Sequence, residues 1–83
     1  MTVVITDTTN SAYAKSATFT CDKTAAYVSI GNDGRVNVCC RNASNRVWRG
    51  MGQFFSNMSE AMDAYKSSAM KAILSAAQAE LAL

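Results

Sequence analysis

The chain has 83 residues, a length that suits one small domain with a thin margin of stability. Apolar residues make up 49% and charged residues 17%, a balance that favours a compact globule and excludes a disordered chain. The net charge of +2 is too small to attract nucleic acid through the overall field, so any effect of charge must be local.

The N-terminal segment MTVVITDTTN has neither the basic region nor the apolar run of a signal peptide. Nowhere does the sequence approach the run of about 20 apolar residues that spans a bilayer. The three cysteines, Cys21, Cys39 and Cys40, form an odd set without C-x-x-C spacing, which favours reduced thiols. We therefore expect a cytoplasmic protein.

Two short runs near the N-terminus have strand character. VVIT, residues 3–6, is β-branched but brief, and it is the weaker of the two. SATFTCD, residues 16–22, alternates: Ala17, Phe19 and Cys21 share one face, and the threonines between them share the other.

The strongest local signal is a hairpin, YVSIGNDGRVNVCC, at residues 27–40. A loop of two residues would pair Ile30 with Arg35 and set an aliphatic side chain beside a charge. A loop of three residues instead pairs Ile30 with Val36 and needs a positive φ at Gly34, which glycine adopts readily. The second register keeps the apolar side chains on one face, whereas a slip by one residue would turn them all outward.

This register divides the hairpin into an apolar face and a polar face. The apolar face carries Val28, Ile30, Val36, Val38 and Cys40, and the polar face carries Tyr27, Ser29, Arg35, Asn37, Cys39 and Arg41. We expect an α+β fold in which an antiparallel meander of three to four strands, within about residues 3–41, packs on one long C-terminal helix.

The helix is predicted over about residues 54–81, because the period of the apolar residues changes after Gly52. Asn57 followed by Glu60 fits a capping box at its start, and a bend near Ser67 is an alternative to a straight helix. The stripe at helical spacing comprises Phe55, Met58, Met62, Tyr65, Ala69, Ala72 and Ala76.

The two halves of this helix differ in side-chain size. The large side chains of the first half are expected to cover the apolar face of the sheet. The alanine-rich second half is expected to extend beyond so small a sheet, where its small side chains allow close packing on a second copy of the chain. The alternative is a frayed, solvated helix end stabilised by the helix propensity of alanine.

Catalytic groups are scarce, and we predict a protein that is not an enzyme and needs no cofactor or metal. The chain has no histidine, the usual general base near neutral pH. Cys39 and Cys40 are neighbours on a strand and point to opposite faces, which disfavours a shared metal ion. Cys39 lies near arginines that would lower the pKa of its thiol, and a reactive thiolate there is the alternative to simple packing.

All four arginines fall between residues 35 and 49, together with the only tryptophan. No acidic residue occurs between Asp33 and Glu60, so the sequence supplies no local counterion within the cluster. Guanidinium groups form bidentate hydrogen bonds with phosphate or carboxylate and stack on aromatic rings. The predicted binding residues are Arg35, Arg41, Arg46, Trp48, Arg49 and Tyr27.

An ordinary structural role is the alternative for the same residues. A tryptophan between a sheet and a helix commonly fills the core, and arginines commonly solvate a surface. Against that, the clustering of all four arginines favours a binding surface.

Two functions remain open. The size of the chain and its lack of catalytic groups are typical of small accessory proteins of phages and mobile elements, anti-CRISPR and anti-restriction inhibitors among them, which would dock on a protein or nucleoprotein complex. The second function is binding of single-stranded nucleic acid by the polar sheet face. The expected order of elements in this chain, a meander followed by a C-terminal helix, is similar to that of the coactivator-type single-stranded DNA-binding dimers.

Overall fold

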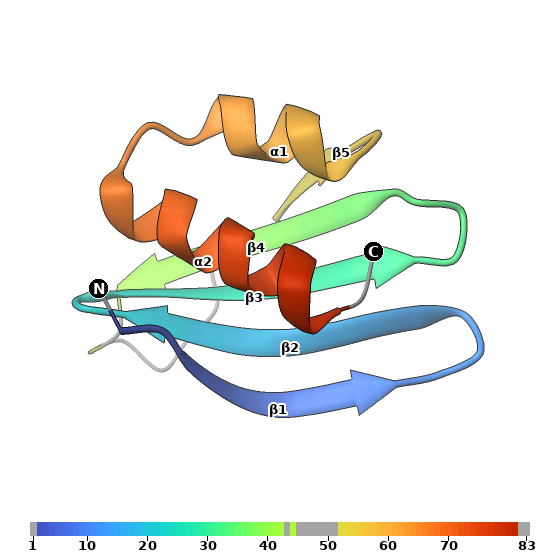
Figure 1. The fold of residues 1–83 in the computed structure, drawn as a ribbon, viewed down its shortest axis with the longest axis horizontal. Helices are drawn as coiled ribbons and strands as arrows, with labels where there is room; N and C mark the ends of the chain where they lie inside the picture. Colours follow the sequence, from blue (N-terminus) through green and yellow to red (C-terminus); the bar gives the residue numbers. More distant parts are fainter. Residues whose placement is uncertain (1, 43, 45–51, 82–83) are drawn as a thin grey trace.

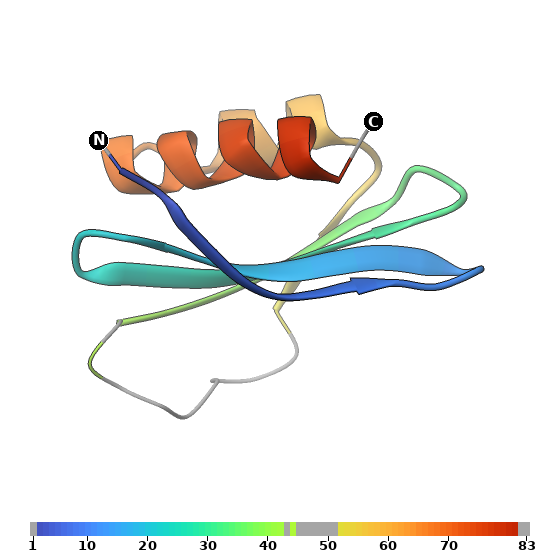
Figure 2. The same cartoon turned by 60° about the horizontal axis from the view of Figure 1, so that its bottom comes forward.

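A helix layer lies on one face of an antiparallel sheet in the computed structural model (Figures 1 and 2), which describes residues 2–42, 44 and 52–81. None of the described helices is long and apolar enough to cross a membrane. In chain order the elements are β1 (Val4–Asn10), β2 (Ala14–Cys21), β3 (Thr24–Gly31), β4 (Val36–Asn42), β5 (Gln53–Phe55), α1 (Met58–Ala64) and α2 (Ser68–Glu80).

The five strands of the described residues form one sheet in the order β1-β2-β3-β4-β5, with every neighbouring pair antiparallel. The predicted α+β class and meander are therefore confirmed, and the weak N-terminal run is a true strand. Edge strand β1 is irregular: its register to β2 shifts between Thr6 and Thr9, and Asp7 has a positive φ of 53°. Such a bulge interrupts the row of backbone groups that an edge strand would offer to other chains.

The predicted hairpin register is correct. Ile30 pairs with Val36, the Gly31 N–H donates to the Arg35 carbonyl at 2.9 Å, and Gly34 has a φ of 89°. The apolar alternation of the two strands is what selects this register, since a slip by one residue would exchange the two faces of the sheet.

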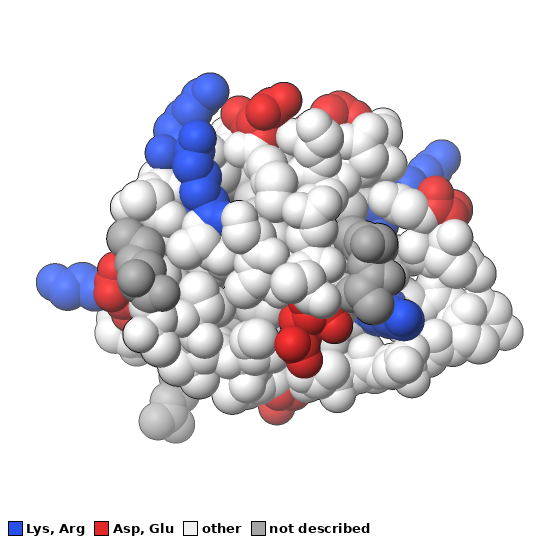
Figure 3. All heavy atoms as spheres, in the orientation of Figure 1, with Lys and Arg blue, Asp and Glu red and all other residues white. Residues whose placement is uncertain are grey.

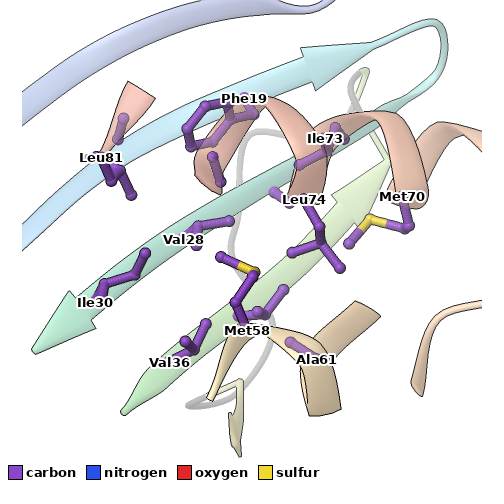
Figure 4. Close-up of a cluster of buried hydrophobic side chains, with 14 of the residues drawn as sticks. Phe19, Val28, Ile30, Val36, Met58, Ala61, Met70, Ile73, Leu74 and Leu81 are labelled. Atoms are coloured by element: carbon purple, nitrogen blue, oxygen red, sulfur yellow. The ribbon is translucent and has the colours of Figure 1, made fainter. Parts of the chain in front are cut away.

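The core lies between the helices and one face of the sheet (Figure 4). The strands contribute mainly the predicted apolar face of the hairpin, together with Ala17, Phe19 and Cys21 from β2. Figure 4 shows Ile73 and Leu74 of α2 directed at these strands, and both side chains are fully buried. We call the other face of the sheet, on the side away from the helices, the open face.

Strand β5 was not predicted, whereas the helix divides close to the bend near Ser67 that the sequence offers as an alternative. The segment read as the start of a helix contains β5, which pairs Phe55 with Val36 and Phe54 with Asn37. Three residues are too few to display the alternation of a strand, and Phe55 also fits the helical stripe.

The predicted long helix is two helices, α1 and α2, with a break at residues 65–67. Tyr65 adopts an extended conformation that lets its ring contact Phe55 edge-on, with 6.0 Å between ring centroids. Its hydroxyl hydrogen-bonds to the Gln53 side-chain carbonyl at 3.2 Å. These contacts to β5 compensate for the helical hydrogen bonds lost at the break, and Ser67 caps the new helix.

The break changes the role of the alanine-rich half. Because the chain turns at residues 65–67, α2 lies across β2 and β3, while α1 lies near β4 and β5 (Figure 1). The expectation that this half extends beyond the sheet is therefore wrong: Met70, Ile73, Leu74 and Ala77 are buried against it. Association with a second copy through this helix stays a prediction.

The caps of the two helices lead to a test of local stability. Asn57 and Ser67 accept hydrogen bonds from the backbone N–H groups of Glu60 and Met70, at 2.9 and 3.1 Å. Replacing either cap residue by alanine is expected to lower the free energy of unfolding by about 1 kcal/mol in urea titrations followed by circular dichroism.

Ser75→Ala is the matched control, because Ser75 is exposed within α2. There the higher helix propensity of alanine should raise stability by a few tenths of a kcal/mol. Equal effects of Ser67→Ala and Ser75→Ala would contradict the cap.

Candidate functional site: the open face of the sheet

The open face presents rows of side chains that run across the strands. One row joins Thr18, Tyr27 and Cys39, and the next joins Ser16, Ser29, Asn37 and Phe54. Strands β2 to β5 place only uncharged side chains and Arg41 on this face; the positions are Ala14, Ser16, Thr18, Thr20, Ala25, Tyr27, Ser29, Gly31, Asn37, Cys39, Arg41 and Phe54.

The open face therefore differs in charge from the helix side. In Figure 3, which looks onto the helices, basic and acidic side chains are both present. Glu60, Asp63 and Glu80 belong to α1 and α2, whereas no carboxylate projects from the open face of β2 to β5. Within strands β2 to β5, a partner that approaches this face meets the guanidinium of Arg41 and no carboxylate.

Tyr27 and Arg41 occupy the predicted polar face. Tyr27 is half-buried in the middle of the sheet, opposite Cys39 of β4. Arg41 is half-buried near the end of β4, and its guanidinium donates a hydrogen bond to the Asn42 carbonyl at 3.4 Å.

Arg35 has a local counterion, which corrects the expectation from the sequence. Its Nε lies 3.6 Å from a carboxylate oxygen of Asp33, and its backbone N–H donates to the other oxygen of that carboxylate at 3.1 Å. The tight turn brings the two residues together, although Asp33 lies just outside the arginine cluster. Both side chains are more than half exposed, at 77% and 58%, so the pair contributes at most about 1 kcal/mol and leaves the guanidinium accessible.

The predicted arginines do not form one compact patch within the described residues. Arg35 precedes β4 and Arg41 lies near its end, so the extended strand separates them by about 20 Å at about 3.3 Å per residue. They share a face but sit at opposite ends of it. Arg46, Trp48 and Arg49 lie outside the described residues, in the chain segment between β4 and β5.

A groove beside Arg35 contains an exposed aromatic residue that was not among the predicted binding residues. We call it the Arg35–Phe54 groove; it has a volume of about 260 Å³ and is lined by Ala14, Ser29, Gly31, Arg35, Val36, Asn37 and Phe54. The Phe54 side chain is 65% exposed, an unusual position for a large apolar ring. The pair Phe54-Phe55 was the available signal, because two adjacent aromatics on a strand must point to opposite faces.

Gly52 lies directly against β4, next to Asn37 of this groove. A Cβ atom at Gly52 would be 2.5 Å from the Cys39 sulfur and 2.6 Å from the Val38 carbonyl oxygen. The Asn37 side-chain oxygen is packed into the same place and, among the described residues, has no hydrogen-bond donor. Close approach of the backbone at Gly52 therefore determines how β5 and Phe54 sit on the sheet.

On the opposite, helix-facing side, Cys40 and Tyr65 form a polar contact at the edge of the core. The Cys40 thiol donates a hydrogen bond to the Met70 sulfur at 3.8 Å, and the Tyr65 hydroxyl lies beside it. Burial raises the pKa of Cys40 by more than the neighbouring Tyr65 hydroxyl lowers it, so the thiol stays protonated at neutral pH. Among the described residues, no three cysteine, aspartate or glutamate side chains gather as a metal site would require.

The same contact makes stability depend on pH. Burial, followed by the neighbouring Cys40, raises the pKa of Tyr65 in the folded state, and the pKa of Cys40 is also raised. The folded state thus holds these protons more tightly than the unfolded state. Their contribution is complete below the pKa values of unfolded cysteine and tyrosine, about 8.5 and about 10, and is lost as the pH rises above them.

We therefore expect urea titrations to show a free energy of unfolding that falls between pH 8 and pH 11. Tyr65→Phe should make this fall shallower, because it removes one of the two groups. Tyr13→Phe is the control, because Tyr13 is 80% exposed. This variant should show the same slope of unfolding free energy against pH as the wild type. Identical slopes for all three proteins would exclude burial of the Tyr65 hydroxyl.

Comparison of the chain with protein-family models, with curated proteins and with solved structures found no match.

Proposed function

We propose that this chain is a small, non-enzymatic binding protein that docks its open face, with the β4–β5 segment, onto a protein or nucleoprotein partner. In size and in its lack of catalytic groups it is similar to the accessory and inhibitor proteins of phages and mobile elements. The observation that carries the proposal is the exposed Phe54 ring beside Arg35, on a sheet face whose strands β2 to β5 bear no carboxylate.

Aromatic and arginine side chains dominate the binding energy of protein interfaces, chiefly where they fill a pocket at its centre. The Arg35–Phe54 groove has room for one partner side chain. The proposal includes Arg46, Trp48 and Arg49, because they lie in the chain segment directly before β5. A cytoplasmic location belongs to it as well, because Cys21, Cys39 and Cys40 are free thiols.

Binding of single-stranded nucleic acid is the second candidate, and one observation favours it. Tyr27 and Phe54 share the open face with Arg41, and aromatic rings interleaved with cations form the platforms on which bases stack. A nucleic-acid strand bound in this way would place several of its phosphates in contact with the protein, and its affinity would fall steeply as the salt concentration rises.

The experiment compares three tagged proteins in pull-downs from bacterial lysate, each with and without nuclease. They are the wild type, Arg46→Glu/Arg49→Glu, and the control Lys66→Glu/Lys71→Glu, which makes the same change of charge on exposed positions of the helix side. The proposal predicts a protein that the wild type and the control retain after nuclease treatment and that the arginine variant loses.

A direct measurement distinguishes the second candidate. The anisotropy of a fluorescent oligothymidine should rise with the wild type at low salt and fall back as salt increases if the open face binds single strands. Retention of the same proteins by all three baits would overturn docking through the arginines. The absence of any anisotropy change at low salt would overturn the nucleic-acid reading.

A further inference from the structure

A second hollow lies between the β1–β2 turn, the β3–β4 turn and the end of α2. Figure 1 shows these three segments at the same end of the sheet. The hollow has a volume of about 310 Å³, and we call it the turn pocket. This volume is at the lower end of the range for small-molecule sites, about 300–1,000 Å³. The residues that line it are Ser11, Ala12, Tyr13, Ala14, Lys15, Ile30, Gly31, Asn32, Gly34 and Leu81.

Hydrogen bonds hold the walls of the turn pocket in place. The Asn32 N–H donates to the Tyr13 carbonyl at 3.0 Å and so ties the tips of the two turns together. The Ser11 hydroxyl donates to the Ala14 carbonyl at 2.9 Å and accepts from the Ala14 N–H at 3.1 Å. A pocket formed in this way exists before a ligand arrives, which reduces the entropic cost of binding.

The lining combines apolar walls with one cation. Ile30 and Leu81 are buried members of the core that reach the pocket, and Tyr13 adds a ring that is 80% exposed. Lys15 pairs with Ile30 across the sheet and is the only charged residue of the lining. Its side chain is half-buried, and no carboxylate of the described residues lies within salt-bridge distance of its ammonium group.

We propose that the turn pocket binds a small carboxylate with an aromatic or short aliphatic body. The apolar body would lie against Ile30, Leu81 and Tyr13, and the carboxylate would meet the ammonium of Lys15. A single ammonium suits one carboxylate better than a phosphate group, which proteins hold with several donors or with an arginine fork. This site is separate from the open face, and it does not depend on the proposed function.

The test is an NMR titration of the ¹⁵N-labelled full chain with three probes of nearly equal shape. They are 3-phenylpropanoate, which is an anion, 3-phenylpropanamide, which is neutral, and 3-phenylpropylamine, which is a cation at neutral pH. The anion is expected to shift the amide signals of Lys15, Gly31, Asn32, Gly34 and Leu81, and to bind about fivefold more tightly than the amide, in line with a partly exposed ion pair. The amine is expected to bind most weakly.

Two lysine variants then identify the cation. Lys15→Met keeps an unbranched side chain, one atom shorter, and removes the charge, so the anion and the amide should bind equally well. Lys23→Met removes an exposed charge from the turn between β2 and β3, outside the lining, and should leave the fivefold preference unchanged.

The wild-type series decides the proposal even if Lys15→Met does not fold. Equal affinity for the three probes, signal shifts confined to other parts of the chain, or no shifts at all would each overturn it. A preference for the anion that survives in folded Lys15→Met would overturn the assignment to Lys15.

Discussion

Phe19→Ala is expected to lower the free energy of unfolding by about 3–5 kcal/mol, the largest loss that we predict for a single side chain. Phe19 is the largest of the fully buried side chains, with an exposed fraction of 0%. It lies between β2 and α2, where Figure 4 shows its ring beneath the helix. A domain of this size has a total stability of about 5–15 kcal/mol or less, so the variant should be close to unfolding at room temperature.

Phe54→Ala is the matched control, because it deletes the same ring from a position that is 65% exposed. Its stability should stay within about 0.5 kcal/mol of the wild type, as is usual for surface positions. Urea titrations of both variants, followed by circular dichroism, measure the difference. Similar losses in the two would mean that the open face, and not only the helix side of the sheet, is an interior surface.

The second large effect is expected at Gly52. Gly52→Ala combines a positive φ of 80° with a Cβ atom that would lie 2.6 Å from the Val38 carbonyl oxygen. The backbone conformation alone costs a residue with a side chain about 1–2 kcal/mol, and overpacking against the strand adds about 1–3 kcal/mol. We therefore expect a loss of about 3 kcal/mol, accompanied by faster hydrogen exchange of the amides that join β4 and β5.

Gly34→Ala separates the two causes, because Gly34 has a similar φ of 89° but nothing within 4 Å of its Cβ position. Only the conformational cost applies there, so the loss should be about 1–2 kcal/mol, with unchanged exchange between β4 and β5. Equal losses at the two glycines would contradict the close packing of Gly52 on β4. If Gly52→Ala stays folded, it should also weaken partner binding, since β5 carries Phe54 into the Arg35–Phe54 groove.

The candidate site was predictable only in part. The alternation of the hairpin places Tyr27 and Arg41 on one face, and the register bears this out. The Asp33–Arg35 ion pair was not predictable from the alternation, because a turn can fold a counterion that lies just outside a cluster in the sequence back onto it. Phe54 was overlooked because a strand of three residues has no periodicity to display.

The turn pocket was beyond sequence reasoning for a different reason. Its lining comes from β2, β3, two turns and the end of α2, which are distant in the chain. Neither Lys15 nor Leu81 has a neighbour in the sequence that points to a ligand. Lys15 and Leu81 come together only because α2 ends above the same end of the sheet at which the two turns lie.

By itself, the sequence determined the elements whose signals are local. Alternating apolar residues and a glycine at the loop set the hairpin and its register, and Asn57 set the start of a helix, because these preferences act within a few residues. The sequence offered a bend near Ser67 only as an alternative, and tertiary contacts determine that the helix breaks there, that β5 joins the sheet and that the alanine-rich half covers β2 and β3. Those outcomes depend on contacts such as Tyr65 with Phe55, whose energy exists only after distant parts of the chain have come together.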